Sequence, residues 1–226
     1  MARASVLVAV MAVLVSSVGG VRVLPSSSSS SGGLGIRAEP VFCHDIECPH
    51  FEVVHKTDAY EVRSYDATVW ATTLLKDVDW DKAEKSGFMR LFNYISGENE
   101  QAIKIPMTAP VRNQVAPGAG PFCASSFNIS FYVPAAFQQS PPAPTDATIS
   151  IRREAAYTYY VAQGKGFWKE DDTEKAAAKL AEALTADGLT FDNSTWFFAG
   201  YDPPFRLIDR HNEVWFRAPS SVATQT

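Results

Sequence analysis

The chain has 226 residues, and 46% of them are hydrophobic, which suits one folded domain with a sizeable core. Its formal net charge is −5 at pH 7. A nucleic-acid partner requires a basic stripe that can neutralise phosphates, and the sequence shows none. The acidic balance therefore argues against nucleic acids, and against anionic membrane surfaces, as partners.

The first 20 residues predict a secretory signal peptide. Arg3 gives a positive start, residues 6–15 are all apolar, and small residues are frequent over 16–20, as in a cleavage zone. The apolar run has 10 residues, whereas a membrane-spanning helix needs roughly 20, so a retained anchor is the weaker alternative. We expect a mature chain without a transmembrane segment, secreted to the extracellular space or, alternatively, kept in a vacuole or another secretory compartment.

Composition divides the rest of the chain. A Ser/Gly-rich run with six consecutive serines cannot bury apolar area, which predicts a flexible linker over residues 21–40. The folded domain is expected over residues 41–219, followed by a disordered tail over residues 220–226.

Three cysteines remain in the mature chain, and an oxidising compartment would pair two of them. Cys43 and Cys48 could close a short local loop. A bridge from Cys48 to Cys123 would remove more chain entropy, and we favour that pairing. A metal site that includes His44 and His50 is the weaker alternative, because no paired C-x-x-C arrangement is present.

Two Asn-x-Ser/Thr triplets are candidate glycosylation sites in a secreted chain. Asn128 falls in a strand pattern, whereas Asn193 falls in a turn, so Asn193 is the better candidate.

The first half of the domain begins with a predicted hairpin. Residues 51–55 and 60–75 alternate β-branched and aromatic residues with others. Asp79 is an N-cap residue type, and the run to Ser96 is closed by Gly97, which predicts a helix. An extended stretch, a strand and a proline-rich linker follow, over residues 104–111, 127–133 and 140–144.

The same order of elements recurs in the second half. Asp171 and Glu174 form a capping-box start for a helix that runs through Ala186 and stops at Gly188. Its flanking strands are predicted at residues 149–153, 157–163, 197–201 and 213–217. The repeat predicts an α+β fold, a distorted antiparallel β-barrel built from a duplicated β-β-α-β-β half with two flanking helices. Coincidence among proline-punctuated strands is the alternative.

The first predicted helix has two apolar faces. One face would pack on the barrel, and it carries Ala83, Gly87, Leu91, Tyr94 and Ile95. The second apolar face is well separated from this packing face around the helix axis, and it carries Phe88, Met89 and Phe92, with Lys85 among them. A planar apolar ligand could lie on these rings with its acid group on Lys85, because an uncovered patch of this size is unfavourable in water. Alternatively, a loop such as residues 116–122 or 203–205 covers them as ordinary core.

An ordered set of motifs spans the folded part. It consists of Tyr60-Glu61-Val62-Arg63-Ser64-Tyr65, Trp70, Gly87-Phe88, Leu91, Tyr94-Ile95, Lys104-Ile105-Pro106-Met107-Thr108-Ala109-Pro110-Val111, Gly120-Pro121-Phe122, Phe131-Tyr132-Val133-Pro134, Ala199-Gly200-Tyr201 and Asn212-Glu213-Val214-Trp215. In this order the motifs strongly resemble the SOUL heme-binding family over about residues 48–218. The cysteines and their neighbours resemble the secreted branch of that family found in plants.

The resemblance implies non-covalent binding of heme or a related porphyrin and no established catalytic reaction. Carried over residue by residue, it proposes Lys85, Phe88, Met89 and Phe92, with Arg206 as a second cation near the porphyrin acids. A relative has His within the first motif, where this chain has Ser64. Because a hydroxyl is a poor heme ligand, we expect binding through the ring and its propionates.

Other functions are less favoured. The histidines His44, His50, His55 and His211 lack a spaced partner and are interpreted as ordinary surface or turn residues. The sequence contains no G-x-S-x-G, H-E-x-x-H or phosphate-binding glycine loop, so an enzyme is not expected. The alternative is an interaction module that receives an unknown protein partner or a lipid-like ligand on the same apolar patch.

Overall fold

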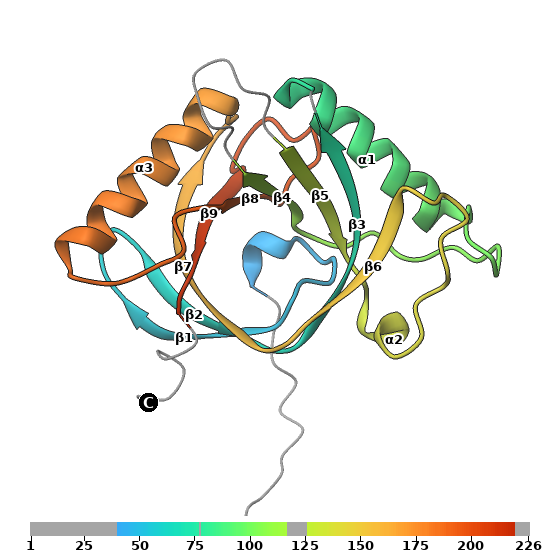
Figure 1. The fold of residues 1–226 in the computed structure, drawn as a ribbon, viewed down its shortest axis with the longest axis horizontal. Coiled ribbons are helices and arrows are strands. Elements are labelled where there is room, and N and C mark those ends of the chain that lie inside the picture. Colours follow the sequence, from blue (N-terminus) through green and yellow to red (C-terminus); the bar gives the residue numbers. More distant parts are fainter. Residues whose placement is uncertain (1–39, 77, 117–125, 220–226) are drawn as a thin grey trace, which may run out of the picture. The chain divides into compact units, whose positions relative to one another are not determined.

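The computed structural model describes residues 40–76, 78–116 and 126–219 (Figure 1). The predicted signal peptide, the tail, Cys123 and all of the predicted linker except residue 40 lie outside these residues. No described helix is long and apolar enough to cross a membrane.

The described residues form one nine-stranded antiparallel sheet that curls into a distorted half-barrel (Figure 1). In space the strand order is β1-β2-β7-β9-β8-β4-β5-β3-β6. In chain order the strands are β1 (Phe51–Lys56), β2 (Glu61–Tyr65), β3 (Thr68–Lys76), β4 (Val111–Ala116), β5 (Ser126–Tyr132), β6 (Ile149–Glu154), β7 (Tyr157–Lys165), β8 (Trp196–Gly200) and β9 (His211–Arg217).

The order of the strands confirms the predicted duplication. On one side of the β8–β4 pair lie β9 and β7, and on the other side lie the corresponding β5 and β3. The first strand of each half crosses to the other half, since β2 pairs with β7 and β6 pairs with β3. The two halves are therefore held together by three strand pairings, and the sheet forms one core.

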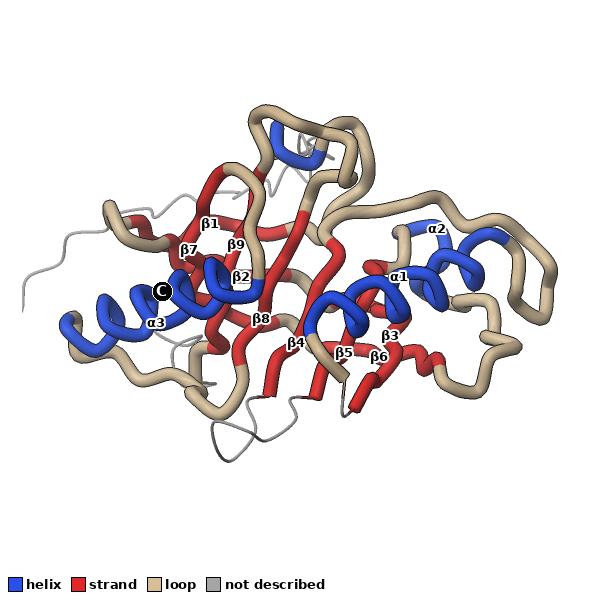
Figure 2. The backbone as a smooth tube through the Cα atoms, turned by 90° about the horizontal axis from the view of Figure 1, so that it is seen from above, coloured by secondary structure: helices blue, strands red, loops and turns tan. Residues whose placement is uncertain are grey.

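Two long helices cover the outer face of the curled sheet, one over each half. The helix α1 (Trp80–Ser96) packs on β3 and β5, and α3 (Glu170–Ala186) packs on β9 and β7 (Figure 2). A four-residue helix, α2 (Ala135–Gln138), was not expected from the sequence. The predicted α+β class with two flanking helices is confirmed.

Several boundaries differ from those that the sequence predicts. The predicted strand at 60–75 is two strands, β2 and β3, and β1 is an additional edge strand outside the repeat. The predicted capping box of Asp171 and Glu174 is wrong, because the cap of α3 lies two residues earlier. Lys169 is the N-cap, and the Asp172 carboxylate accepts from its backbone N–H at 3.0 Å. The predicted linker at 140–144 packs on α1, because the Tyr94 hydroxyl donates to the carbonyl of Pro142.

Alternation along the strands gives two apolar cores. One lies between the sheet and the helices and includes Leu91, Ile129, Leu184 and Val214. The other lies on the inner face of the curl and includes Tyr65, Tyr159, Phe197, Tyr201 and Trp215, together with Cys43 and Cys48. The inner face is therefore packed with aromatic side chains.

The disulfide differs from the pairing that we favoured. Cys43 is bonded to Cys48, which is the short local loop, so the predicted Cys48–Cys123 bridge is wrong. The entropy argument favoured a long loop, but the 3-10 helix η1 (Val41–Cys43) turns the chain back and places both cysteines on the inner face.

Candidate functional site

The position of α1 against the sheet determines which of its side chains face outwards. The Asp79 carboxylate caps the helix by accepting from the backbone N–H of Lys82 at 2.9 Å, and Gly97, with φ of 121°, ends it. The predicted packing face is confirmed, since Ala83, Gly87 and the other members of that set are all buried. At Gly87 a Cβ atom would lie 2.8 Å from Ile129 Cβ, so the helix lies unusually close to β5.

Beside this face lies a strip of three apolar residues and one lysine, which we call the α1 flank: Lys85, Phe88, Met89 and Phe92. Phe88 is half-buried, because its ring lies 5.2 Å from the Phe131 ring of β5, edge to face. Phe92 stacks on Phe88 at 5.8 Å with an interplanar angle of 13°. Met89 and Phe92 stay 48% and 42% exposed, and Lys85 is exposed. The structure thus brings together four of the five residues proposed for ligand binding.

The alternative that a loop covers the α1 flank has limited support. Of the two loops considered, residues 117–122 lie outside the described part of the chain. Phe205 of the other loop is itself 81% exposed, so its ring does not pack on the flank. A groove of about 820 Å³ does exist on the outer face, but it lies along α3. The α1 flank is an exposed apolar surface.

Arg206, the fifth proposed residue, lies on the loop between β8 and β9. Its Nε atom is 3.1 Å from Asp202 Oδ1 and donates to the carbonyl of Ile208 at 3.2 Å. Arg206 therefore braces its own loop. Arg210, which the sequence did not single out, attracts the Glu84 carboxylate of α1 and so tends to lower its pKa. Burial has the larger, opposite effect, and the pKa of Glu84 lies above its ordinary value.

The same loop carries an apolar tip that sequence reasoning missed. Phe205, Leu207 and Ile208 are all more than 70% exposed. Arg210 holds the base of the loop by donating to the carbonyls of Pro203 and Arg206 at 2.7 and 3.0 Å. The two arginines thus bond within their own loop, whereas its three large apolar side chains are left exposed. Three large apolar residues within four positions after a Pro-Pro pair were the available signal.

In the part of the chain that the structure describes, few side chains near the α1 flank are of a type that ligates heme iron. Ser64 lies in β2, which pairs with β1 and β7, whereas α1 packs on β3 and β5. Met89 is the member of the flank with a donor atom of a type that ligates heme iron. Among the described residues, no group of three or more His, Cys, Asp or Glu side chains is placed to hold a metal ion. The flank suits an apolar ring with an acidic edge.

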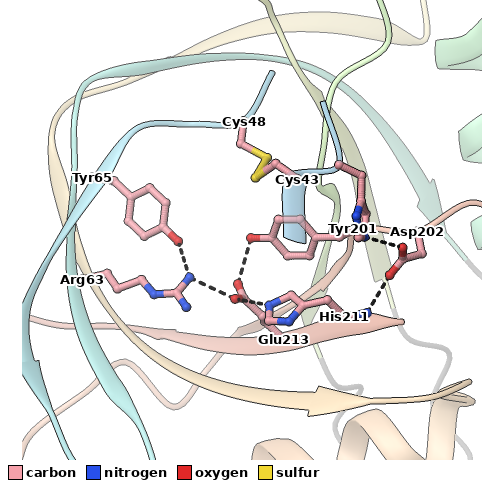
Figure 3. Close-up of a disulfide and its surroundings, with 9 residues drawn as sticks. Cys43, Cys48, Arg63, Tyr65, Tyr201, Asp202, His211 and Glu213 are labelled. Atoms are coloured by element: carbon pink, nitrogen blue, oxygen red, sulfur yellow. Dashed lines mark hydrogen bonds and ion pairs between the residues drawn. A yellow bond between two sulfur atoms is a disulfide. The ribbon is translucent and has the colours of Figure 1, made fainter. Parts of the chain in front are cut away.

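A second group of chemically reactive side chains lies on the inner face, below the disulfide (Figure 3). Arg63 Nη1 is 3.0 Å from Glu213 Oε1, and both side chains are at most 1% exposed. The other Glu213 oxygen accepts from the Tyr201 hydroxyl at 2.9 Å and from the Trp215 indole at 2.8 Å. Burial alone would raise the pKa of Glu213, but Arg63 and His211 outweigh it, and the pKa lies below its ordinary value. Glu213 is therefore a buried carboxylate.

Two of the histidines belong to this group and not to the open surface. His211 begins β9, and its Nε2 atom is 2.7 Å from Glu213 Oε1. His44 Nε2 lies 2.9 Å from Asp202 Oδ1. His44 lies in a turn, as expected, whereas His211 begins β9 and is mostly buried. The contacts of both were missed, because sequence spacing does not reveal that residues 44, 202, 211 and 213 meet.

The two candidate glycosylation sites differ in access. Asn193 is exposed in the turn before β8. Asn128 lies within β5, pairs with Gln114 and Leu74 on its two neighbouring strands, and donates to the Gln114 side chain at 3.2 Å. Of the two candidates, Asn193 is therefore the more accessible side chain.

A curled antiparallel sheet with one helix on each half defines an α+β protein of the distorted half-barrel type, and its α1 flank is an exposed apolar surface. The family model described as "SOUL heme-binding protein" matches residues 46–217, and this chain belongs to that family. Heme-binding protein 2 of Homo sapiens is 40% identical over 157 residues, which cover 70% of this chain and 77% of that protein. Heme-binding protein 1 of Xenopus laevis is 34% identical over 158 residues, which cover 70% of this chain and 83% of that protein.

A solved structure with low sequence identity has a similar fold. The C-terminal domain of EcmrR covers 71% of this chain and 98% of its own, with a TM-score of 0.52 and 12% identity. At that identity the likeness concerns the fold alone.

Proposed function

We propose that this chain binds heme or a related tetrapyrrole non-covalently on the α1 flank, and so sequesters or transports it in the secretory pathway or the extracellular space. The family supports the ligand class, and the sequence of the first 20 residues supports the compartment. The observation that carries the site is that Met89 and Phe92 remain 48% and 42% exposed on a helix whose neighbouring face is fully packed.

Each residue of the flank has a separate task in this proposal. Phe92 and Met89 would contact the ring, and covering a large apolar side chain contributes about 1.5–3 kcal/mol when its burial is complete. Phe88 supports Phe92 from below through their stacked rings. Lys85 would pair with a propionate at the edge of the ring. The proposal assigns the chain no chemical conversion of the ligand.

Titration of the purified chain with hemin and with iron-free protoporphyrin IX tests the proposal. We expect saturable spectral changes at micromolar ligand. The double variant Met89→Ala/Phe92→Ala should bind about tenfold more weakly, because it removes two exposed contacts and little of the core. Stronger binding of hemin than of protoporphyrin would indicate iron ligation, with Met89 as the donor on the flank.

The matched control is Val53→Ala, an apolar residue of β1 that is 47% exposed, whereas α1 packs on β3 and β5. Unchanged hemin affinity in this control and loss in the α1 variant would locate the site. The absence of any saturable change at micromolar ligand would contradict the proposal.

The alternative is an interaction module that presents the same flank to a protein or a lipid-like ligand. An exposed apolar surface such as the α1 flank can receive a broad partner as well as a flat ring. The titrations separate the two functions. Both need an intact α1 flank, but only heme binding predicts a saturable spectral change with hemin.

A further inference from the structure

The loop that carries the disulfide covers the charged group on the inner face. We call residues 41–48 the plug loop. It begins with η1, closes through the Cys43–Cys48 bridge, and lies beside Tyr201 and His211 in the curl of the sheet (Figure 3). The family model matches from residue 46, so Phe42, Cys43 and His44 lie outside the matched region.

Two side chains seat the plug loop. The Phe42 ring stacks on the His211 ring with centroids 4.0 Å apart and an angle of 5°, and it meets Tyr201 edge-on at 4.9 Å. The charged end of Arg63 lies 5.7 Å from the centre of the same ring. His44 contacts Asp202, whose other carboxylate oxygen accepts the backbone N–H of His211 at 2.6 Å. The plug loop therefore closes over the side chains that hold Glu213.

The two ends of the plug loop are fixed in different ways. At the Cys48 end, the Glu47 carbonyl accepts from the N–H of Ala109 at 3.0 Å, and its carboxylate accepts from the N–H of Ala135. At the Cys43 end, the backbone N–H groups of His44 and Ile46 donate within the loop, and that of Cys43 donates to Pro40, the residue just before it. The disulfide thus cross-links the end that carries Phe42 to the end at Cys48, which is anchored through Glu47.

The backbone between the cysteines needs this tie. His44 and Asp45 have φ of 53° and 65°, the left-handed region that disfavours residues with a Cβ atom. Two such residues in succession persist only when their surroundings hold them in place. Without the bridge, the loop can relieve these unfavourable φ values by leaving this conformation, and doing so moves Phe42 and His44.

We propose that the Cys43–Cys48 disulfide latches the plug loop over the inner face, so that reduction unseats Phe42 and His44 and opens the Arg63–Glu213 group to solvent. A dithiol reductant supplies two electrons and two protons; the S–S bond breaks, both cysteines become thiols, and the reductant closes to its own disulfide. Because both sulfurs are buried, the exchange occurs when the loop opens transiently. The inner face is then closed in an oxidising compartment and open in a reducing one.

The test compares the oxidised full-length chain with the same chain after dithiothreitol, when the thiol count rises by two. NMR would follow the His211 ring and backbone amide. We expect the ring resonance to lose the shift caused by the stacked Phe42, and the amide to exchange about ten times faster. The oxidised Phe42→Ala variant is the matched control, because it defines the His211 resonance without the Phe42 ring while the bridge remains.

The double variant Cys43→Ser/Cys48→Ser should reproduce the reduced state without reductant. If it does not fold, reversible reduction of the folded wild-type chain gives the result alone. Retention of the oxidised His211 resonance and amide protection after reduction would overturn the proposal. So would a simultaneous loss of protection in α1 and α3, because the proposal confines the change to the plug loop. Hemin titration reports on the α1 flank and so keeps the two proposals distinguishable.

Discussion

The two long helices occupy corresponding places in the duplicated fold, yet they present different surfaces. Both have 17 residues, and they start ninety positions apart, at Trp80 and Glu170. Three of the buried positions correspond: Ala83 with Thr173, Gly87 with Ala177, and Tyr94 with Leu184. The outward positions do not, since Phe88, Met89 and Phe92 of α1 correspond to Ala178, Lys179 and Glu182 of α3.

This difference separates what the fold requires from what the site requires. The helix α3 shows that a helix at this position of the fold can carry alanine, lysine and glutamate on its outward face. Ala178 and Glu182 line the groove along α3, in the place where Phe88 and Phe92 stack over β5 on the other half. The lysine is common to both helices, because Lys85 corresponds to Lys175. The aromatic flank of α1 is therefore an addition to the scaffold.

The largest effect is expected when α1 receives the outward residues of α3. The double variant Met89→Lys/Phe92→Glu should weaken hemin binding by about 100-fold, because both contacts with the porphyrin ring are lost and the two added charges would have to be desolvated beneath it. Stability should hardly change, since both side chains are about half exposed. Hemin titration and urea unfolding of the same samples measure the two quantities.

The reciprocal change sharpens the comparison. Ala178→Phe, Lys179→Met and Glu182→Phe together would give α3 the α1 pattern beside Lys175, and we expect this variant to bind a second hemin. Wild-type affinity in the Met89→Lys/Phe92→Glu variant would show that the ligand lies elsewhere.

A smaller effect is expected at the position where the two helices approach the sheet differently. Gly87→Ala would place a Cβ atom 2.8 Å from Ile129 Cβ. Overpacking costs about 1–3 kcal/mol, and the better helix propensity of alanine recovers about 1 kcal/mol. We expect a net loss of about 1 kcal/mol in the free energy of unfolding, measured by urea titration.

Ser86→Ala, at the neighbouring exposed position of α1, is the control for helix propensity. It should leave stability unchanged or slightly increased. A stabilised Gly87→Ala chain would mean that α1 moves away from β5 freely, and that the close approach does not fix the α1 flank.

Much of this architecture follows from local pattern. Period-2 and helical periodicity, the Asp79 cap and Gly97 are local signals, and they predicted both long helices and the duplicated order. The split of residues 60–75 into β2 and β3 was missed because Asp66 and Ala67 interrupt an otherwise continuous strand pattern. The exchange of β2 and β6 between halves depends on pairing across the chain, which periodicity does not encode.

The site shows the same division. The α1 flank was predictable, because its residues lie within eight positions of one helix. The inner-face group was not, because residues 42, 63 and 213 come from distant segments that meet only in the folded chain. The disulfide was mispredicted for a related reason: loop entropy ranks pairings by sequence distance, whereas the turn at η1 decides which cysteines meet.

The smallest effect concerns a pair of glutamates at corresponding positions, Glu84 in α1 and Glu174 in α3. Glu84 is half-buried, and burial, with Asp81 adding to it, raises its pKa above the ordinary 4.5 against the opposing pull of Arg210. A raised pKa in the folded state favours folding while the carboxyl is protonated, and this contribution is lost as the pH rises through the folded pKa. Glu84→Gln should therefore gain stability relative to the wild type as the pH rises from 4 to 7.

Urea unfolding of both chains across that pH range measures the difference, and other titrating groups cancel because they are common to both. Glu174→Gln, at the corresponding exposed position of α3, is the matched control for the substitution itself. If Glu84→Gln instead loses stability with rising pH, the attraction between Glu84 and Arg210 outweighs burial. The β8–β9 loop would then be tied electrostatically to α1, and its apolar tip would be held beside the α1 flank.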